Sequence, residues 1–198
     1  MAGRVVAVIL AAGASRRMGT PKLALPLGGQ PLLAYAIEAA RESRVNDVVV
    51  VTGSHADALT SLLTAPGLAR VHNAAWAEGL SSSLRCGVAA AEERGADAVL
   101  ILLGDQPDVT PALLNSLIEA HESGAHIAAC RYADGTTGPP ALFDREEFEN
   151  LRRLTGDQGA RSLLDRAPDR AEFVAFPRGA DDVDRPEDLE RADDRFSR

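Results

Sequence analysis

The sequence predicts an α/β fold in which a mostly parallel central sheet is covered by helices on both faces. Two observations predict it. Short apolar runs rich in β-branched residues alternate with longer segments of helical spacing, and this alternation implies right-handed crossovers between parallel strands. The runs are also apolar at nearly every position rather than at every second one, which is typical of strands buried on both faces.

The first 132 residues carry the clearest alternation. Strands are expected at 4–10, 47–53, 69–73, 97–105 and 126–132. Helices are expected at 31–43, 55–64, 80–95 and 110–124. Pro31 and Pro111 stand where the first turn of a helix accepts proline, and Gly95 and Gly124 follow helices at positions that favour a left-handed residue.

The pattern is less regular after residue 132. A Gly- and Pro-rich turn, a short apolar segment and a polar helix are expected within 133–151, a second helix within 155–167 and a strand within 171–177. An acidic loop then leads to a last helix with Pro186 near its first turn. Because no repeat, linker or clear boundary divides the chain, a single domain spanning 1–198 is predicted.

Composition limits the function. Hydrophobic residues make up 45% of the chain and charged residues 25%, as in ordinary globular proteins. The formal net charge of −8 argues against a nucleic-acid binder, because non-specific affinity for a polyanion needs a surplus of Lys and Arg. Cys86 and Cys130 have no partners at metal-ligand spacing, so both are expected to be reduced core residues.

The apolar run near the start allows two interpretations. It ends in the small residues 11–14, as the apolar region of a secretory signal does. However, only Arg4 precedes it, and the run is too short to cross a bilayer. Its valines and the glycine that follows favour a buried parallel strand. A cytoplasmic protein with no membrane partner is therefore predicted.

In an open parallel sheet, ligands bind beyond the carboxyl ends of the strands. The loop after the first expected strand, 11–22, has small residues that let backbone amides approach a ligand, followed by Arg16, Arg17 and Lys22. Amide donors and fixed cations together are what a polyphosphate requires. The loop is neither a Walker A motif nor GxGxxG, so taken alone it is equally compatible with a solvated polar loop.

A second loop with a candidate functional side chain begins at Asp105, a carboxylate directly after the most hydrophobic strand. A carboxylate is costly to desolvate there unless it meets a cation, and Mg²⁺ favours one or two carboxylates together with phosphate oxygens. The alternative, that Asp105 caps the next helix, is weaker because Thr110 is better placed as the cap. Asp108, nearby, is interpreted as a turn residue.

Acidic residues also crowd the loop before the last helix, at Asp181, Asp182 and Asp184. Such runs are usually solvated surface. Asp184, however, follows a predicted strand and precedes a helix that begins with proline, so it could face the same end of the sheet as Asp105. Two carboxylates from different loops could then share one magnesium ion.

These loops belong to sequence blocks that resemble the MobA-like nucleotidyltransferases, most closely the molybdenum cofactor cytidylyltransferase (MocA-type) branch. The blocks, which span nearly the whole chain, are LAAGASRRMGTPKLALPLGGQPLL, NAAWAEGLSSSLRCG, LLGDQPDV, GPPALF, GDQGAR and DVDRPEDL. The resemblance implies a Rossmann-like three-layer α/β/α fold of the nucleotide-diphospho-sugar transferase type. It also implies transfer of a nucleoside monophosphate from an NTP to a phosphate acceptor, with pyrophosphate release and help from magnesium.

The resemblance implies a role for each matching residue. Arg17 and Lys22 would bind the triphosphate and stabilise the transition state, and Asp105, counted with them as catalytic, would hold Mg²⁺ together with Asp184. A helix beginning near Leu80 would also direct free amides and serine hydroxyls toward the ligand, a role compatible with simple helix capping by those serines. The residues expected to bind the nucleotide are Leu10, Ala11, Ala12, Gly13, Asn73, Gly79, Ser81 and Ser83.

No side-chain nucleophile or general base is required for this reaction. The acceptor phosphate is already an anion and can attack the α-phosphorus in line, so the protein has only to position the reactants and neutralise charge. The four scattered histidines are accordingly assigned no chemistry. They are His55, His72, His121 and His126.

The choice of base depends on the first block. Guanylyltransferase relatives begin with a Gly-Gly pair and place an Asp before the lysine, whereas this chain has Ala11-Ala12-Gly13 and Pro21-Lys22. This difference favours transfer of CMP from CTP to the phosphate of molybdopterin. Pro139 stands where many cytidylyltransferases would be more polar, which leaves the acceptor contact open.

Two alternatives remain open. The chain could transfer GMP or another nucleotide to molybdopterin, a sugar phosphate or another phosphorylated metabolite. It could also be a non-catalytic chaperone that binds nucleotide or cofactor and delivers the cofactor to a molybdoenzyme. The expected partners are thus an NTP, a molybdopterin-type acceptor and a molybdoenzyme or its chaperone, and a monomer or weak dimer is expected.

Overall fold

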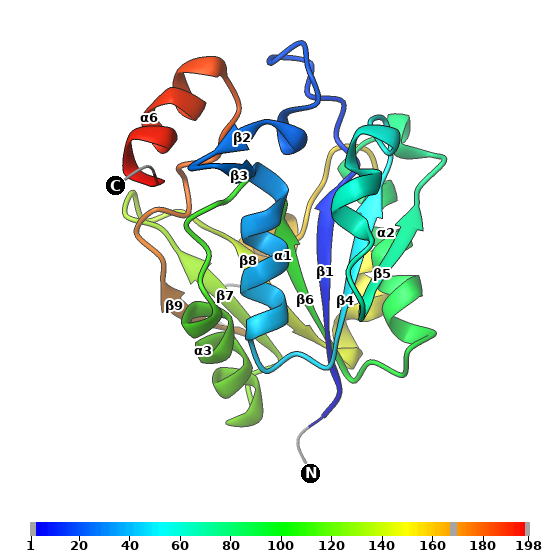
Figure 1. Ribbon diagram of the computed structural model, residues 1–198. Helices are drawn as coiled ribbons and strands as arrows, with labels where there is room; N and C mark the ends of the chain where they lie inside the picture. The colour runs from blue at the N-terminus through cyan, green and yellow to red at the C-terminus, as the bar shows by residue number, and fades with distance from the viewer. Residues whose placement is uncertain (1–2, 167–169, 197–198) are drawn as a thin grey trace.

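The computed structural model describes residues 3–166 and 170–196, which form a seven-stranded sheet between two layers of helices (Figure 1). The strand order is β5-β4-β1-β6-β8-β7-β9. These strands are β1 (Val5–Ala11), β4 (Asp47–Thr52), β5 (Leu68–His72), β6 (Ala98–Leu103), β7 (Ile127–Arg131), β8 (Thr137–Asp144) and β9 (Ala171–Ala175). A separate ribbon consists of β2 (Pro26–Leu27) and β3 (Gln30–Pro31).

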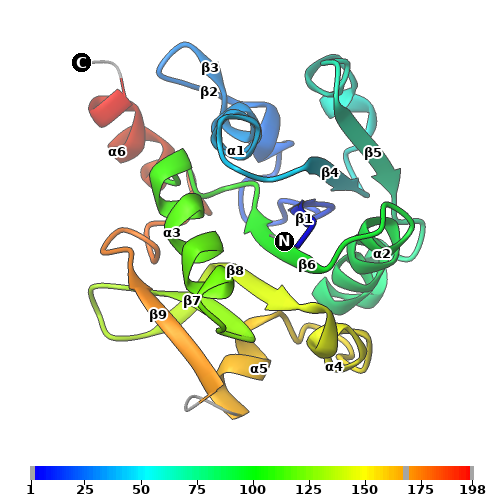
Figure 2. The same ribbon diagram turned by 90° about the horizontal axis from the view of Figure 1, so that it is seen from below.

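The helices lie on both faces of the sheet, with α1 and α3 on one face and α2, α4 and α5 on the other (Figure 2). They are α1 (Leu32–Glu42), α2 (Leu80–Glu92), α3 (Pro111–Glu122), α4 (Phe148–Arg152), α5 (Arg161–Arg166) and α6 (Pro186–Phe196). Short 3₁₀ segments include η1 (Lys22–Ala24), η2 (Asp57–Leu63), η3 (Trp76–Glu78) and η4 (Arg145–Glu147). None of the helices in the described ranges is long and apolar enough to span a membrane.

The predicted fold class is confirmed. β1 pairs in parallel with β4 and β6, β4 pairs in parallel with β5, and β7 pairs in parallel with β9. Within the described residues only β8 reverses this direction in the large sheet, because it runs antiparallel to both β6 and β7. The sequence predicted no strand here, only a short apolar segment, since the Pro139-Pro140 pair is unusual inside a ladder.

β1 is buried along its whole length and joins the two halves of the core. Ala7 and Ile9 pack in the cluster beneath α1 and α3, whereas Val8 and Leu10 pack in the cluster beneath α2 and α4. Gly87 lets α2 approach closely, because a Cβ there would lie 2.3 Å from Val8 Cγ1. The continuous apolar run therefore indicates burial on both faces, as the sequence predicted.

The carboxyl end of β1 is where the chain changes direction across the sheet. The connection through α1 leads from β1 to β4 over one face, whereas α2 leads to β6, on the other side of β1, over the opposite face. Ligand sites of open α/β sheets form at such a switch point. The geometry therefore places the ligand end of the sheet beside the loop that follows β1.

Several local expectations can now be compared with the structure. Pro111 and Pro186 begin α3 and α6, and Gly95 and Gly124 take positive φ values of 71° and 111°, as predicted. Pro31 differs, because it precedes α1 as the cap residue.

The predicted 55–64 helix is a 3₁₀ segment instead. Thr60 and Thr64 side chains donate hydrogen bonds to backbone carbonyls of the same segment, which competes with regular α-helical pairing. In the predicted 155–167 helix, residues up to 160 form a loop before α5, and Ala167 lies outside the described residues.

The cysteines are both free. Cys130 lies in the core, where burial raises the pKa of its thiol to about 12, and Cys86 is partly exposed beside the second core cluster. Burial and the nearby Glu93 also raise the pKa of Cys86. Both thiols are therefore poor nucleophiles at neutral pH.

Candidate functional site

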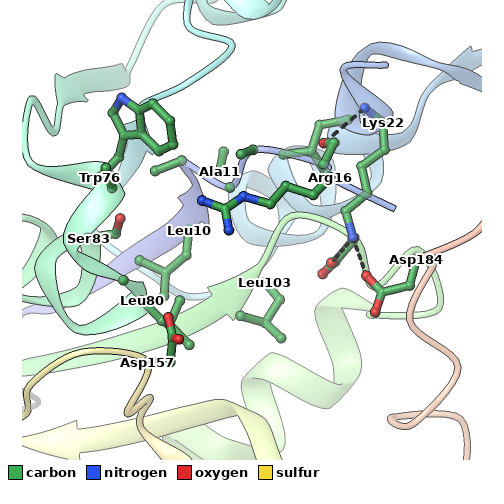
Figure 3. A pocket seen from close by; sticks show the side chains of 18 of the residues that line it. Leu10, Ala11, Arg16, Lys22, Trp76, Leu80, Ser83, Leu103, Asp157 and Asp184 are labelled. Atoms are coloured by element: carbon green, nitrogen blue, oxygen red, sulfur yellow. Dashed lines mark hydrogen bonds and ion pairs between the residues drawn. The ribbon is translucent and has the colours of Figure 1, made fainter. Parts of the chain in front are cut away.

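A cavity of about 520 Å³ opens at the carboxyl ends of β1 and β6 (Figure 3). Its size falls in the range of about 300–1,000 Å³ that is usual for small-molecule sites. Ten residues predicted from the sequence line it: Leu10, Ala11, Ala12, Gly13, Arg17, Lys22, Gly79, Ser83, Asp105 and Asp184. The other lining residues are Ala14, Ser15, Arg16, Leu23, Trp76, Ala77, Glu78, Leu80, Leu103 and Asp157.

The loop after β1 is held in shape by its own hydrogen bonds. Ser15 has a φ of 47°, and its carbonyl accepts bonds from the amides of Met18 and Gly19. The Ser15 hydroxyl accepts a 3.3 Å bond from the Lys22 amide, and His55 Nε2 donates to the Ala14 carbonyl at 3.1 Å. These bonds fix Lys22 at the start of η1, where its side chain reaches the cavity.

Lys22 joins two carboxylates that come from distant parts of the chain. Its Nζ lies 2.7 Å from Asp105 Oδ2, in the loop after β6, and 2.6 Å from Asp184 Oδ1, in the loop before α6. The Lys22 and Asp105 side chains are only 13% and 19% exposed. The carboxylates of Asp105 and Asp184 are thus brought together at the edge of the cavity, with the Lys22 ammonium group between them.

The charges of this triad shift its pKa values in opposite directions. Burial alone lowers the pKa of Lys22, but Asp105 and Asp184 outweigh it and raise that pKa above its ordinary value. The hydrogen bond from Lys22 lowers the pKa of Asp184, with further help from the charge of Arg17. Lys22 is therefore a fixed cation at neutral pH, and Asp184 is a fixed anion.

The two neighbouring arginines take different positions. Arg17 NH1 lies 2.6 Å from Asp184 Oδ2, and the Arg17 side chain is 68% exposed. The side chain of Arg16 extends into the middle of the cavity, between Trp76 and Lys22 (Figure 3). The family resemblance assigned triphosphate binding to Arg17 and gave Arg16 no role of its own, so the structure adds Arg16 as a second candidate.

The opposite wall is less charged and carries an aromatic ring. Trp76, Leu80, Ser83 and Asp157 lie across the cavity from Lys22 (Figure 3). Gly53 lets this wall approach the loop after β1, because a Cβ there would lie 2.7 Å from Trp76 Cβ. Trp76 and Asp157 lie inside the sequence blocks that carry the family resemblance, but one sequence alone gave no reason to single them out.

Two of the predicted nucleotide-binding residues do not line the cavity. Asn73 is buried behind the wall, where its Nδ2 donates to Ser82 Oγ at 2.8 Å and to Ser83 Oγ at 3.0 Å. Ser81 Oγ accepts a 3.1 Å bond from Arg85. Their contacts orient Ser83, which does face the cavity, and stabilise the first turn of α2.

The start of α2 offers fewer free amides than the sequence predicted. The Ser81 amide donates to the Gly156 carbonyl at 3.0 Å, and the Ser82 amide donates to the Gly79 carbonyl at 3.1 Å. The expectation that these amides point at the ligand is therefore wrong for both residues, because a loop from the C-terminal third accepts the first bond and the residue preceding α2 accepts the second.

The alternative roles considered for the Asp105 loop are also resolved. Thr110 caps α3 by accepting a bond from the Leu113 amide at 3.2 Å, so Asp105 is not the cap. Asp108 forms ion pairs with Arg178 at 3.4 Å and Arg195 at 2.8 Å. It therefore ties α6 to the loop after β6 in addition to being a turn residue.

Comparisons with known proteins identify the family. The MobA-like NTP transferase domain matches residues 7–171. The chain belongs to the MobA-like NTP transferase family. It is 34% identical over 197 residues to the purine catabolism protein PucB of Bacillus subtilis, with 94% of each chain covered. It is 31% identical over 172 residues to nicotine blue oxidoreductase of Paenarthrobacter nicotinovorans, with 83% of each covered.

Solved structures that are similar to this chain in sequence have the same fold. Rv0371c of Mycobacterium tuberculosis matches with a TM-score of 0.85 and 34% identity, over 98% of this chain and all of that one. A complex of Rv0371c with manganese matches with a TM-score of 0.79 and 30% identity, over the same shares of the two chains. The family resemblance and the fold expected from sequence are both confirmed.

Gly79 permits a close contact that shapes the transferase cavity. It has a φ of 109°, and a Cβ there would lie 2.4 Å from the Gly156 carbonyl oxygen. Gly79→Ala should reduce the free energy of unfolding and raise KM for the nucleotide, because the loop that carries Asp157 must move. Gly124→Ala is the matched control, since Gly124 has a φ of 111° but no atom within 4 Å of the position that a Cβ would occupy.

Denaturant unfolding and initial-rate kinetics of both glycine variants measure these effects. Both should lose about 1–2 kcal/mol from the strained backbone. Gly79→Ala should lose about 1–3 kcal/mol more from the clash, and only this variant should show a raised KM. Equal losses and unchanged KM in both variants would contradict the packing role of Gly79.

Asp182 lies next to Lys22, Asp105 and Asp184, but one of its carboxylate oxygens, Oδ1, is buried without a hydrogen-bond partner among the described residues. Burial, together with the charges of Asp105 and Asp184, raises the pKa of Asp182 to about 7. The folded protein therefore binds a proton at Asp182 between about pH 4 and pH 7, where the unfolded chain has released it.

This raised pKa predicts a pH-dependent stability. The contribution of Asp182 is fully present below about pH 4 and is lost as the pH rises through about 7. The free energy of unfolding of Asp182→Asn, relative to the unmodified protein, should therefore increase between pH 4 and 7. Denaturant unfolding at several pH values measures this change in the free energy of unfolding, and Asp181→Asn, at an exposed position, is the control. A difference between Asp182→Asn and the unmodified protein that stays constant with pH would contradict the raised pKa of Asp182.

Proposed function

We propose that this protein transfers CMP from CTP to the phosphate of molybdopterin, with release of pyrophosphate, in a reaction that requires Mg²⁺. The observation that carries the proposal is the position of Lys22, whose Nζ bonds Asp105 and Asp184 at the edge of the cavity beside the loop after β1. Fixed cations and metal-binding carboxylates at one point suit phosphoryl chemistry, in which charge shifts between phosphate oxygens. A binding module has no need of such a group.

The cavity has two chemically different ends, and they support one orientation of the nucleotide. The base and ribose would lie toward Trp76 and Ser83, where an indole ring and a hydroxyl are available. The triphosphate would lie toward Arg16 and Lys22, with the small residues of the loop after β1 beside it. Arg17 would add positive charge from the rim.

The residues at the charged end fit a magnesium ion. Asp105 and Asp184 both reach the point marked by Lys22 Nζ, and the buried Asp182 carboxyl has an oxygen without a partner among the described residues. Carboxylates are the ligands that Mg²⁺ takes when it also binds phosphate oxygens. The relative Rv0371c has been solved with manganese, another divalent cation that prefers oxygen ligands.

The reaction then depends on positioning. An oxygen of the acceptor phosphate forms a bond to the α-phosphorus while the bond to the pyrophosphate oxygen breaks, so no proton has to be removed by a side chain. Lys22 and Arg16 would donate N–H bonds to phosphate oxygens and neutralise the charge that develops on pyrophosphate. Asp105 and Asp184 would hold Mg²⁺, which supplies Lewis-acid stabilisation of the same charge.

The base and the acceptor are supported by sequence features. Ala11-Ala12-Gly13 and Pro21-Lys22 depart from the guanylyltransferase pattern, which supports CTP. The six blocks support molybdopterin, with a molybdoenzyme or its chaperone as the next partner and the cytoplasm as the location. A competing activity comes from the relative named nicotine blue oxidoreductase, so reduction of a dye-like substrate has to be tested as well.

Pyrophosphate release across the four NTPs tests the proposal, with and without molybdopterin and with and without Mg²⁺. We expect release from CTP only when both are present. Equal turnover of GTP would overturn the cytidylyl assignment, and release with a sugar phosphate in place of molybdopterin would overturn the acceptor. Consumption of a nicotinamide reductant without pyrophosphate release would overturn nucleotidyl transfer itself.

A further inference from the structure

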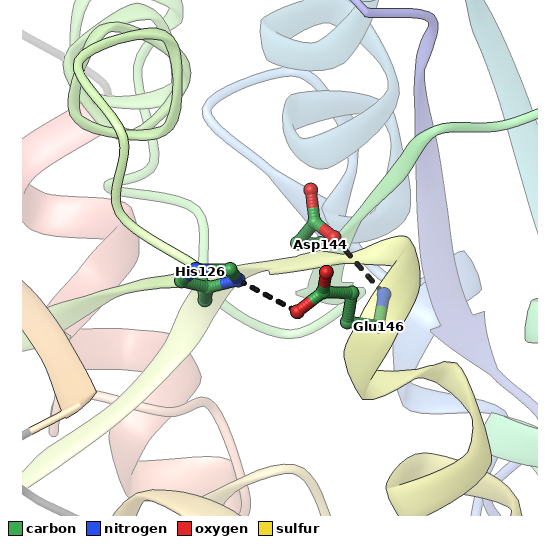
Figure 4. A group of neighbouring side chains, drawn as sticks. All are labelled: His126, Asp144 and Glu146. Carbon is green, nitrogen blue, oxygen red and sulfur yellow. Dashed lines mark hydrogen bonds and ion pairs between the residues drawn. The ribbon is translucent and has the colours of Figure 1, made fainter.

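Three side chains converge at the opposite end of the sheet from the cavity (Figure 4). They are His126, which precedes β7, Asp144, at the end of β8, and Glu146, in η4. One ligand atom from each lies within 4.8 Å of the other two. Asp144 pairs with Ala98 at the start of β6, which places this cluster at the amino ends of the parallel strands, away from Lys22.

The backbone holds these three residues together. The Asp144 amide donates to the His126 carbonyl at 2.8 Å, so two of the positions are linked directly. Asp144 Oδ1 accepts a 2.9 Å bond from the Glu146 amide and caps η4. This leaves the other carboxylate oxygen, Oδ2, available to a ligand. His126 Nδ1 lies 3.3 Å from Glu146 Oε2 on the exposed side.

A second histidine approaches the same carboxylate from α3. His121 Nδ1 lies 3.1 Å from the Ala125 carbonyl oxygen, and because a carbonyl can only accept, Nδ1 carries the proton. Its Nε2 lies 3.8 Å from Asp144 Oδ2. His121 therefore approaches Asp144 but lies outside the group of three residues whose ligand atoms are all mutually close.

We propose that His126, Asp144 and Glu146 form a binding site for Zn²⁺, separate from the magnesium site of the proposed reaction. One imidazole nitrogen and two carboxylates are ligands that Zn²⁺ accepts, and water takes the fourth position in sites with three protein ligands. Ligands about 2.0–2.1 Å from a tetrahedral zinc ion lie about 3.3 Å from one another. The 3.3 Å between His126 Nδ1 and Glu146 Oε2 already matches this separation, and the ligand atom of Asp144 lies within 4.8 Å of both residues.

A bound ion would add a second link between the residue before β7 and the junction of β8 and η4. The backbone already links them through the bond from the Asp144 amide to the His126 carbonyl. Zinc binding would therefore stabilise the folded protein in proportion to the logarithm of the free zinc concentration. The His126 and Glu146 side chains are 51% and 71% exposed, so the ion can reach the site from solvent and substitution of either residue leaves the core intact.

Metal titration of the untagged, metal-free protein tests this site. Zn²⁺ affinity is measured by calorimetry, and Co²⁺ serves as the spectroscopic probe because its visible absorption reports tetrahedral coordination. The site variants are His126→Ala and Glu146→Ala. His72→Ala removes an exposed histidine on β5, at the other edge of the sheet, and Asp105→Asn removes a proposed magnesium ligand.

We expect one equivalent of Zn²⁺ to bind, a tetrahedral Co²⁺ spectrum, and a Tm that rises with Zn²⁺. His126→Ala and Glu146→Ala should each raise Kd about tenfold or more and abolish the Tm shift. His72→Ala and Asp105→Asn should leave Kd unchanged. No stoichiometric binding, or binding that survives both site variants, would overturn the proposal; binding that is lost only in Asp105→Asn would assign the ion to the cavity instead.

Discussion

Replacing Lys22 with methionine is expected to lower kcat for pyrophosphate release about 100- to 1,000-fold, which corresponds to roughly 2.7–4 kcal/mol of transition-state stabilisation. Methionine keeps most of the length of the unbranched side chain but removes the positive charge that lies 2.7 Å from Asp105 and 2.6 Å from Asp184. Lys22 is the only lysine in the sequence, so no other ammonium group can replace it. Steady-state kinetics with CTP, molybdopterin and Mg²⁺ measure the loss.

Two further variants separate the role of Lys22 from a general loss of charge. Arg44→Met removes a cation that pairs with Glu122 at 2.7 Å, far from the cavity, and should leave kcat unchanged. Lys22→Arg keeps the charge but replaces the compact ammonium with a planar fork, so it should recover only part of the activity. A Lys22→Met enzyme with the same kcat as the unmodified protein would contradict the proposed charge neutralisation.

The Lys22→Met variant should also respond differently to Mg²⁺. Without the ammonium group, Asp105 and Asp184 face each other with no cation between them, which should lower Tm in metal-free buffer. A divalent cation bound by the two carboxylates would restore that Tm. The rise in Tm on adding Mg²⁺ is therefore expected to be larger for Lys22→Met than for the unmodified protein, as measured by thermal unfolding.

Replacing Asp105 with asparagine is expected to reduce kcat about a thousandfold or more while the protein stays folded. The amide has nearly the same shape but lacks the charge that a divalent cation and Lys22 both require. Lys22 keeps its bond to Asp184, so the structure of the loop should be retained. Circular dichroism and thermal unfolding check the fold, and pyrophosphate release measures the activity.

Asp108→Asn is the matched control for this change. Asp108 lies in the same loop, and its side chain is 17% exposed, close to the 19% of Asp105. It pairs with Arg178 and Arg195 rather than with Lys22, so its loss should lower Tm without a comparable loss of kcat. If Asp105→Asn kept its activity, the proposed magnesium ligand would be wrong.

Much of the sheet could be predicted from the sequence because its strands are buried on both faces. A continuous apolar run such as 5–10 indicates a buried parallel strand when a glycine and charged residues follow it. The positive-φ positions at Gly95 and Gly124 could be predicted for a similar local reason, since few other residues accept that conformation. Local sequence sufficed where local burial or local backbone geometry decided the structure.

Features that depend on distant contacts could not be predicted in the same way. The strand β8 contains two prolines and is stabilised by its pairing with β6 and β7, which no local pattern reveals. The use of the Ser81 amide by Gly156 depends on a loop 75 residues further along the chain. The direction of the Arg16 side chain depends in the same way on the surrounding fold.

The candidate site combines features that local sequence predicts with features that depend on distant contacts. Lys22, Asp105 and Asp184 each follow or precede a recognisable element, and their residue types indicated a shared anion and cation chemistry. Their direct contact, across 83 and 162 residues of chain, is visible only in the folded protein. The group of His126, Asp144 and Glu146 at the other end of the sheet gave no sequence signal, because β7 and most of β8 lie between the histidine and the two carboxylates in the chain.

The fate of the α-phosphorus of CTP tests the central claim most directly. The protein is incubated with molybdopterin, Mg²⁺ and CTP labelled with ³²P at the α-position, and the products are separated by chromatography. Transfer of CMP predicts that the label moves into the molybdopterin product while pyrophosphate stays unlabelled, and that Asp105→Asn abolishes the transfer. Label that remains in CTP, or that is released only as free CMP with molybdopterin unmodified, would contradict it.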